Sequence, residues 1–454
     1  MSENTITAIS TAAGKGAVGI VRLSGEETFA LVNRLFTAQS GAAAQHWRAG
    51  QLMLGTLRNQ DGTVLDHALC VVRRAPFSYT GEDMAEFHCH GSPALLLLLL
   101  ETLVSCGARL AQAGEFTKRA FLNGRLHLSE AEAVGDLIDA RSERSVKNAA
   151  AQLGGALSRR IAGIYDPLLT VAAHFHAVLD YPDEDIDAFT AERLQQALDE
   201  ALRQCAALLK SYETGRFFNG GIPCAIVGRP NSGKSSLLNA LLGYERAIVT
   251  HIAGTTRDTV EEQISLGGLS LRLIDTAGLR ESSDLVEQLG VERSRRAMAE
   301  AALILWVIDG TRPLSEEDWA VAAAMPAGVP VLALVNKADL GAQLPADASL
   351  PQTVLISARE KTGLQELERQ ITALFPLNAD VELGSVLTNA RQFDAASRGG
   401  AFLAQAAESL RQGVPLDAVI ADLELALEAL GELNGTSLRE DMTARIFEKF
   451  CVGK

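Results

Sequence analysis

The residues best suited to chemistry lie in one glycine-rich stretch, GRPNSGKS, at positions 228–235. The pattern GxxxxGK[ST] is matched by Gly228, Gly233, Lys234 and Ser235. Glycines let backbone N–H groups approach phosphate, and the helix that follows adds positive potential at its N-terminus. Lys234 can then reach the β and γ oxygens, and Ser235 offers a hydroxyl to Mg²⁺. The stretch therefore predicts a site for a nucleoside triphosphate and magnesium.

Three further motifs follow in the order that this chemistry needs. DTAG at 275–278 would place a carboxylate near the metal and a glycine amide near the γ-phosphate. NKAD at 336–339 ends another strand-like run, and Asp339 can accept two hydrogen bonds from the N1 and N2 hydrogens of guanine. Adenine lacks that donor pair, so the predicted base is guanine. SAR at 357–359 fits a loop that touches the guanine oxygen through its backbone.

A threonine-rich loop, THIAGTTRDTV, lies between the first two motifs, and its position predicts a switch in which Thr255 and Thr256 close over the γ-phosphate. Leu279 stands where many GTPases carry a glutamine that orients the attacking water, so another group must orient it. The predicted GTP-binding residues are Asn231, Ser232, Gly233, Lys234, Ser235, Ser236, Thr250, His251, Ile252, Ala253, Gly254, Thr255, Thr256, Asp275, Thr276, Ala277, Gly278, Asn336, Lys337, Ala338, Asp339, Ser357, Ala358 and Arg359.

The elements that must position these motifs divide the chain into four segments. Residues 1–117 alternate short apolar runs with two helical stretches and predict an α/β domain. Residues 118–215 and 379–454 carry long amphipathic helices, which are expected to pack on each other. Residues 216–378 alternate apolar strands with helices, as in a mainly parallel sheet covered on both faces. We therefore expect an α/β unit inserted into one helical domain.

The composition is that of a globular protein of several domains, with 454 residues, 47% hydrophobic and 21% charged. A net charge of −15 argues against a whole-chain footprint for nucleic acid but allows a local basic patch. No secretory signal or stretch of about 20 apolar residues is visible, so we expect a cytoplasmic protein without a membrane span. The scattered cysteines are expected to be reduced thiols: Cys70, Cys89, Cys106, Cys205, Cys224 and Cys451.

These motifs together resemble the MnmE (TrmE) family of tRNA-modification GTPases. The resemblance rests on GRPNSGKSSLLNAL, AGTTRD, DTAGLR, NKAD and the terminal CVGK, with TGEDMAEFHCHG and GEFTKRAFLNGRL in the front half. It implies an α/β and α multidomain protein: an N-terminal α/β domain for tetrahydrofolate binding and dimerisation, and a helical domain interrupted by a Ras-like P-loop GTPase domain.

The resemblance also implies the reaction. Together with an FAD-dependent partner protein, in a heterotetramer built on a homodimer, the family modifies C5 of the wobble uridine (position 34) of certain tRNAs. The modification is of the carboxymethylaminomethyl type and uses a one-carbon tetrahydrofolate, either the 5-formyl or the 5,10-methylene derivative. GTP hydrolysis is activated by K⁺ in place of an arginine finger.

Several ligand assignments follow from the resemblance alone. It places Ser235 and Thr256 on Mg²⁺. The K⁺ ligands that it implies are Asn231, Thr250, Ile252 and Thr255. Glu287 is the implied water-orienting acid, with an exposed helix glutamate as the alternative. A monovalent cation beside the phosphates fits chemically, because it supplies the charge that an arginine would.

For folate the resemblance points to Arg22, Glu82, Arg125 and Lys454. A pterin edge suits a carboxylate, and the glutamate tail of a folate suits cations. Each of these residues taken alone is more often a solvated surface charge, so only the resemblance selects them. One departure from the expected plain strand is His88-Cys89-His90.

The terminal CVGK presents a thiol, a glycine and a cation. If the segment folds back onto the front domain, Lys454 with Arg125 would favour the thiolate form of Cys451 and make it a catalytic candidate. The alternative is that Cys451 packs and only Lys454 contacts folate. Gly453 would allow the close approach in both cases.

Two other patterns compete with this interpretation. Gly14, Gly16 and Gly19 spell GxGxxG, but the run IVRLSG continues as a strand where a dinucleotide site needs a helix. His88 and His90 have metal-ligand chemistry, yet strand alternation places Cys89 on the opposite face.

The alternative function is a regulatory or ribosome-assembly GTPase that binds RNA without modifying it. An added basic RNA-binding module would favour that alternative, and none is visible in the sequence. A purely structural dimer is disfavoured by the intact nucleotide motifs.

Overall fold

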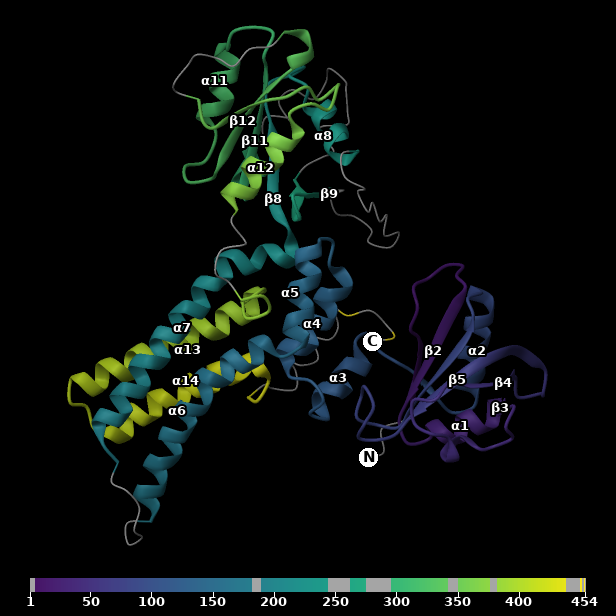
Figure 1. Ribbon diagram of the computed structural model, residues 1–454. Coiled ribbons are helices and arrows are strands. Elements are labelled where there is room, and N and C mark those ends of the chain that lie inside the picture. Colours follow the sequence, from purple (N-terminus) through teal and green to yellow (C-terminus); the bar gives the residue numbers. More distant parts are fainter. Residues whose placement is uncertain are drawn as a thin grey trace. The chain divides into compact units, whose positions relative to one another are not determined.

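The computed structural model describes residues 5–181, 189–243, 262–274, 295–341, 350–375 and 382–437, together with Phe450 and Gly453. The chain forms two compact units, Met1–Gly135 with Leu427–Lys454, and Asp136–Ala426. We call them the front unit and the central unit, and Figure 1 shows their elements. Within the described ranges, no helix is long and apolar enough to cross a membrane.

The front unit is built on a seven-stranded sheet with the order β3-β4-β5-β6-β2-β1-β7. Its strands are β1 (Ile6–Ile9), β2 (Val18–Ser24), β3 (Phe36–Ala38), β4 (Met53–Arg58), β5 (Val64–Arg73), β6 (Met84–His90) and β7 (Arg109–Leu110). All neighbouring pairs are antiparallel except β1 with β7. Strands β2 and β6 lie in the middle of this sheet, so side chains at their facing positions meet.

Helices α1 (Thr28–Leu35) and α2 (Pro93–Ser105) cover the sheet of the front unit, and a 3₁₀ turn, η1 (Ala44–His46), follows β3. Leu31, Leu35, Leu99 and Leu103 of these helices pack with Phe87 of β6 in one core. Gly19 lies in β2, which confirms that the GxGxxG pattern leads into a strand. The small α/β fold predicted for this part of the chain is therefore confirmed.

Helix α3 (Glu115–Leu122) follows β7, and Phe116 packs with Ile6 and Met84. Phe121 and Phe450 pack on Leu128 and Ala131, so a residue near the end of the chain belongs to this unit. The predicted domain boundary at 117/118 falls inside α3.

The six-stranded sheet of the central unit has the order β13-β12-β11-β8-β10-β9. Its strands are β8 (Ile222–Val227), β9 (Glu262–Leu266), β10 (Leu269–Leu273), β11 (Leu303–Asp309), β12 (Val331–Asn336) and β13 (Thr353–Leu355). The pairs among β8, β10, β11, β12 and β13 are parallel, as predicted. The antiparallel edge strand β9 was not predicted, because its polar residues alternate with only two buried apolar ones.

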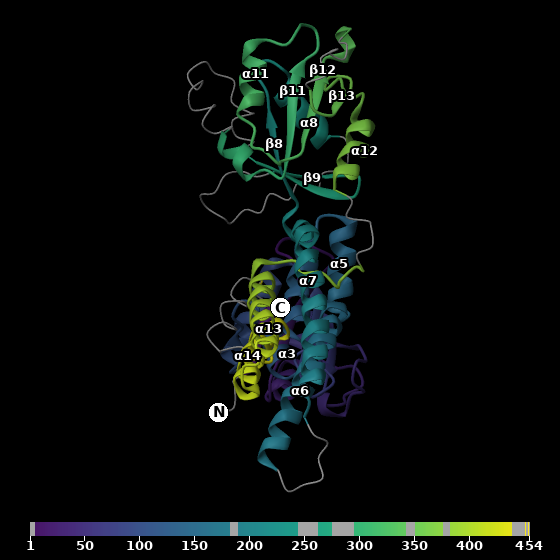
Figure 2. The same ribbon diagram turned by 90° about the vertical axis from the view of Figure 1, so that its left-hand side faces the viewer.

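Both faces of this parallel sheet are covered, as the continuous apolar strands predicted. Leu303, Leu305 and Val307 of β11 pack in a core with α8 (Lys234–Leu242) and α12 (Leu364–Leu374). Ile304, Trp306 and Ile308 face the other core, toward α11 (Glu316–Ala323). Figure 2 shows α11 on one side of the strands and α8 and α12 on the other.

The helical part contains α4 (Leu128–Asp139), α5 (Glu143–Leu153), α6 (Ala156–Asp180), α7 (Ala191–Gly220), α13 (Ala390–Arg411) and α14 (Leu416–Asn434). Helices α7 and α13 lie side by side (Figure 2). Tyr212 stacks on Phe393 with ring centroids 4.6 Å apart, and Cys205 Sγ donates to the carbonyl of Ala396 over 3.4 Å. The helical segments before and after the α/β segment therefore pack on each other, although the α/β segment separates them in sequence. This confirms the predicted fold class.

Candidate functional site

The glycine-rich loop connects β8 to α8, in the strand–loop–helix order that the motif requires. Gly228 and Gly233 have φ angles of 149° and 102°, which lie in the region that favours glycine. A Cβ atom on Gly228 would lie 2.3 Å from the carbonyl oxygen of Val307, and one on Gly233 would lie 2.1 Å from Asn336 Nδ2. Both glycines are therefore required by the close approach of β11 and β12 as well as by backbone conformation.

Lys234 begins α8, and its ammonium lies inside the loop. Its Nζ donates to the carbonyls of Gly228 and Arg229, each over 2.8 Å. Burial lowers the pKa of Lys234. Asn231, Ser235 and Ser236 are exposed on the same loop and first turn, where a phosphate or a metal ion would reach them.

The NKAD segment is tied to this loop by Asn336 at the end of β12. Asn336 Nδ2 donates to the carbonyl of Ser232 over 3.0 Å, and its Oδ1 accepts from the backbone N–H of Ala358 over 3.0 Å. Ser357 Oγ donates to Asp339 Oδ1 over 2.6 Å. One buried amide thus joins three predicted segments, and Asp339 is oriented by a serine of the third segment.

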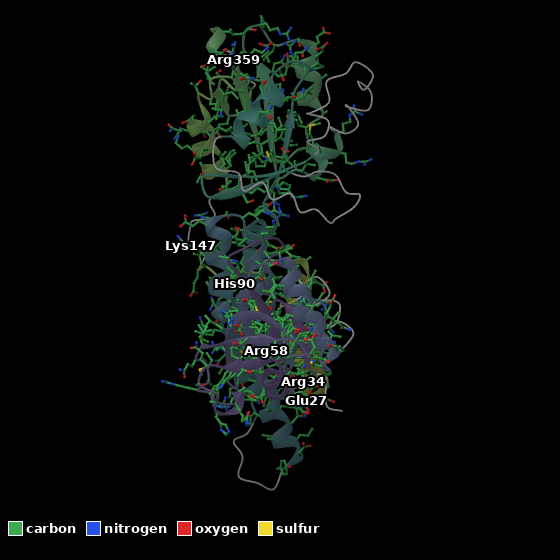
Figure 3. The ribbon with its side chains drawn as sticks, turned by 90° about the vertical axis from the view of Figure 1, so that its right-hand side faces the viewer. Glu27, Arg34, Arg58, His90, Lys147 and Arg359 are labelled. Atoms are coloured by element: carbon green, nitrogen blue, oxygen red, sulfur yellow. The ribbon has the colours of Figure 1, made fainter. Side chains whose placement is uncertain are left out.

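Lys337 and Arg359 point in different directions. Lys337 has a φ of 70°, and its Nζ donates to Asp309 Oδ2 over 2.8 Å. The Arg359 side chain is 79% exposed and lies at the surface (Figure 3). Ala338 lies in the 3₁₀ turn η2 (Ala338–Leu340).

Many of the predicted nucleotide and metal ligands lie outside the described residues, and these assignments stay predictions. They are Thr250, His251, Ile252, Ala253, Gly254, Thr255, Thr256, Asp275, Thr276, Ala277, Gly278 and Glu287. Cys451 and Lys454 of the terminal tetrapeptide also lie outside them.

The front unit brings Arg22 of β2 opposite Glu86 of β6. Arg22 Nη2 lies 2.8 Å from Glu86 Oε1, and Arg22 Nε donates to the same oxygen over 2.9 Å. The guanidinium also lies over the rings of Tyr79 and Phe116, at 5.8 and 5.6 Å from their centroids. The carboxylate at Arg22 is therefore Glu86, a residue that the sequence analysis did not select.

Glu82 has different partners. Arg119 Nη1 donates to both of its carboxylate oxygens, over 3.1 and 3.0 Å, and Ser24 Oγ donates to Oε2 over 2.6 Å. Arg119 comes from α3 and also pairs with Glu115. Glu82 is thus part of an ion-pair network in the front unit, while Arg22 and Glu86 form a separate pair.

Arg125 follows α3, and its Nε donates to the carbonyl of Ser78 over 3.2 Å. Its stem also lies near Gly81, since a Cβ atom on Gly81 would be 3.3 Å from Arg125 Cγ. Arg125 therefore lies beside the loop that carries Glu82, and the joint assignment of these two residues to folate stays a prediction.

Gly453 is buried against the first strand of the front unit. Its carbonyl oxygen accepts from Ser10 Oγ over 3.0 Å and from Arg22 Nη1 over 3.4 Å. Its φ is 102°, and a Cβ atom would lie 2.3 Å from the carbonyl oxygen of Ile9. This close contact is the role predicted for Gly453, and it places one residue of the terminal tetrapeptide beside Arg22.

The histidine pattern does not form a metal site among the described residues. Cys89 is buried, whereas His88 lies near Glu86. His90 pairs with Asp66, with Nδ1 of the histidine 2.8 Å from Oδ1 of the carboxylate. Burial raises the pKa of Cys89 to about 12. The strand alternation predicted for this segment is confirmed.

Sequence reasoning missed three groups in the two sites: Glu86, Arg119 and Asp309. Glu86 follows Glu82 by four residues in the same stretch, and only the register of β2 against β6 distinguishes the two. Asp309 had a detectable signal, because it is the polar residue that ends a run of six buried apolar residues in β11.

A parallel sheet with a glycine-rich loop between β8 and α8, and an Asn-Lys-x-Asp segment after β12, defines a P-loop GTPase domain. Comparison with known proteins extends this class to the whole chain. Residues 5–125 match the model of the GTP-binding protein TrmE N-terminus, and residues 128–451 match the model of the MnmE helical domain. The chain therefore belongs to the MnmE family of tRNA modification GTPases.

Relatives named tRNA modification GTPase MnmE match the chain over its length. The Heliobacterium modesticaldum protein is 41% identical and covers 100% of both chains. The Clostridioides difficile protein is 39% identical over 100% of this chain and 99% of its own. The Aquifex aeolicus protein is 41% identical over 99% of each. A solved structure of Aquifex aeolicus Era is 30% identical over 39% of this chain and 65% of its own, with a TM-score of 0.26.

Proposed function

We propose that this protein couples GTP hydrolysis to modification of C5 of the wobble uridine in certain tRNAs, with a one-carbon tetrahydrofolate as the carbon source. It acts as a homodimer with an FAD-dependent partner protein in a heterotetramer. The single observation that carries the proposal is the contact of the Gly453 carbonyl with Ser10 and Arg22. That contact joins Gly453 of the terminal tetrapeptide to Arg22, one of the residues selected for folate.

The proposed folate site uses Arg22, Glu82, Arg125 and Lys454, with Glu86 added by its ion pair with Arg22. A carboxylate beside a guanidinium suits a pterin edge, which has both donors and acceptors. The aromatic rings of Tyr79 and Phe116 border the same guanidinium. This chain's residues would bind and orient the folate, which supplies the transferable carbon when bound.

In the proposed nucleotide site, GTP binds through the residues named from the sequence, with Mg²⁺ on Ser235 and Thr256. K⁺ is held by Asn231 with Thr250, Ile252 and Thr255, and Glu287 orients the water. Asn231 has a φ of 61° and is exposed within the phosphate loop. This placement supports its assignment to K⁺. The domain boundaries in this proposal are 1–117, 118–215, 216–378 and 379–454.

The test of the proposal is deletion of Cys451 to Lys454 in the full-length protein. We expect loss of tRNA modification and of bound reduced folate, with GTP turnover nearly intact, because the GTP motifs lie in the other unit. Normal modification by the deletion variant would contradict the proposal. Cys451→Ser then separates the two roles of the thiol: modification lost with folate still bound supports thiol chemistry, and normal modification supports packing.

The potassium assignment has its own test. Hydrolysis should be slow in Na⁺ and faster in K⁺ at matched ionic strength, because K⁺ beside the phosphates supplies positive charge in the transition state. Equal rates in the two salts would contradict the assignment.

A further inference from the structure

Asp309 is a buried carboxylate between the phosphate loop and the NKAD segment. It ends β11, directly opposite Asn336 of β12, and its side chain is 4% exposed. The backbone N–H of Gly310 donates to the carbonyl of Asn336 over 3.0 Å. No motif of the nucleotide site includes Asp309, so its burial needs an explanation.

The two oxygens of Asp309 have different partners. Oδ1 accepts from the backbone N–H of Thr311 over 3.2 Å and from its hydroxyl over 2.7 Å, which fixes the carboxylate plane. Oδ2 accepts from Lys337 Nζ over 2.8 Å and also faces Arg312 Nε at 3.3 Å. Burial alone would raise the pKa of Asp309, but the hydrogen bonds from Lys337 and Thr311 outweigh it and lower the pKa. Asp309 is therefore a charged group with one oxygen directed at cations.

The third cation is Arg229, the residue after Gly228 in the phosphate loop. Its side chain is 7% exposed, with Nη2 at 3.8 Å from Asp309 Oδ2 and Nε at 3.4 Å from Asp318 Oδ1. Asp318 is itself fixed, because it forms a capping box with Ser315 at the start of α11. Two buried acids thus surround this guanidinium.

The backbone of Arg229 belongs to the phosphate-binding machinery. Its carbonyl accepts from Lys234 Nζ over 2.8 Å and from the backbone N–H of Ser232 over 3.4 Å. The buried side chain of Arg229 and this carbonyl belong to one residue, so fixing the side chain between two acids restrains the backbone that carries the carbonyl. On the other side, Lys337 lies two residues before Asp339, the predicted guanine acceptor.

We propose that Asp309 is a positioning residue of the GTPase site, which holds the phosphate loop through Arg229 and the guanine-binding segment through Lys337. One carboxylate then aligns phosphate and base recognition together, in addition to the direct bond from Asn336 to Ser232. The competing explanation is that Asp309 only neutralises buried cations and supports folding.

The test uses Asp309→Asn in the full-length protein, with GDP and inosine diphosphate as probes. Inosine lacks the 2-amino group, so the ratio of the two affinities reports the alignment of Asp339, whereas the affinity for inosine diphosphate reports mainly the phosphate loop. We expect a loss of about tenfold for GDP, because the charge-assisted hydrogen bond from Lys337 is weakened. We expect a loss of about threefold for inosine diphosphate, because the more distant ion pair of Arg229 with Asp309 is lost. Arg312→Gln, which removes a half-exposed cation from the same oxygen, is the matched control and should bind both nucleotides as the unaltered protein does.

A folded Asp309→Asn variant that binds both nucleotides normally would overturn the proposal. An equal loss of affinity for both nucleotides would also overturn it, because only the phosphate loop would then depend on Asp309. A loss confined to GDP would overturn it as well, because only the guanine-binding segment would then depend on Asp309. A double-mutant cycle with Lys337→Met adds a readout that a structural role would not give: the two losses should be strongly non-additive. If Asp309→Asn does not fold, Thr311→Val is the second variant, because it removes only the hydroxyl that donates to Asp309 Oδ1. The ratio of the affinity for GDP to that for inosine diphosphate should then fall about twofold. An unchanged ratio overturns the proposal.

Discussion

The nucleotide site of the central unit and the Arg22 site of the front unit are built in different ways. In the central unit the loops are local segments that follow β8, β12 and β13, and most of the described polar contacts there use backbone atoms. In the front unit Ser10, Arg22, Glu86 and Gly453 meet through strand pairing and a contact between residues 443 apart in sequence. Segments that are local in sequence can be recognised as a motif, whereas residues that meet through strand register can be recognised only once the fold is known.

Among tests of the difference between the two sites, we expect Lys234→Ala in the central unit to have the largest effect, on GTP hydrolysis. Its ammonium is the one charged side chain inside the described phosphate loop that a γ-phosphate would meet, and removal of such a preorganised donor typically costs about 100-fold or more in turnover. Hydrolysis of GTP, measured as released phosphate, should fall by that amount while reduced folate stays bound. Turnover near that of the unaltered protein would contradict the role of the loop.

Asp339→Asn should change the base that the central unit prefers. The amide can donate to the O2 of xanthine but cannot accept two hydrogen bonds from guanine, so affinity for GTP should fall by about 100-fold. Xanthosine triphosphate should become the preferred nucleotide in competition binding. Equal affinity of the variant for both nucleotides would count against this assignment.

In the front unit, Glu86→Gln and Glu82→Gln should give different results. Glu86 lies against Arg22, so its loss should weaken folate retention by about tenfold without lowering stability much. Glu82 pairs with Arg119, which is 3% exposed, so its loss should lower thermal stability by about 1–3 kcal/mol. Folate release and thermal unfolding measured on both variants decide which of the two carboxylates contributes more to folate binding, and the reverse pattern would make Glu82 the main ligand.

The smallest effect concerns pH and compares two glutamates. Burial would raise the pKa of Glu115, but hydrogen bonds from Arg109 and the backbone of Gln112 lower it below its ordinary value of 4.5. Its stabilisation is therefore present above about pH 4.5 and lost as the pH falls through the lower pKa of the folded state. After allowance for solvent screening, Glu115→Gln should cost about 1 kcal/mol at pH 7 and less at pH 4.

Glu366 on α12 is the matched control for this pH experiment. The hydrogen bond from Arg369 lowers the pKa of Glu366 to about 2, but the pair is exposed. Glu366→Gln should therefore leave urea unfolding at pH 7 almost unchanged. If Glu366→Gln lowered the free energy of unfolding more than Glu115→Gln does, the predicted contribution of the ion pairs around Glu115 would be contradicted.

The same contrast explains how much could be predicted from the sequence. Five parallel strands and the loops after β8 and β12 were predictable, because apolar runs and short motifs report on their own neighbourhood. The choice between Glu82 and Glu86 was not, since it depends on the register in which β2 pairs with β6. The partners of Asp309 were also not predictable, because Arg229 and Lys337 are 108 residues apart in sequence and meet only when the sheet forms.

The packing of strand β11 links substitutions in the apolar core to nucleotide affinity. All seven of its residues are buried, and alternate side chains fill the cores on opposite faces of the sheet. The strand cannot shift along its axis without exchanging the two sets of side chains between cores. Packing on both faces therefore fixes the place of the carboxylate of Asp309 at the end of the strand. A cavity made at Ile304 or Leu305 would loosen that constraint, so nucleotide affinity can serve as a sensitive gauge of packing in an apolar interior.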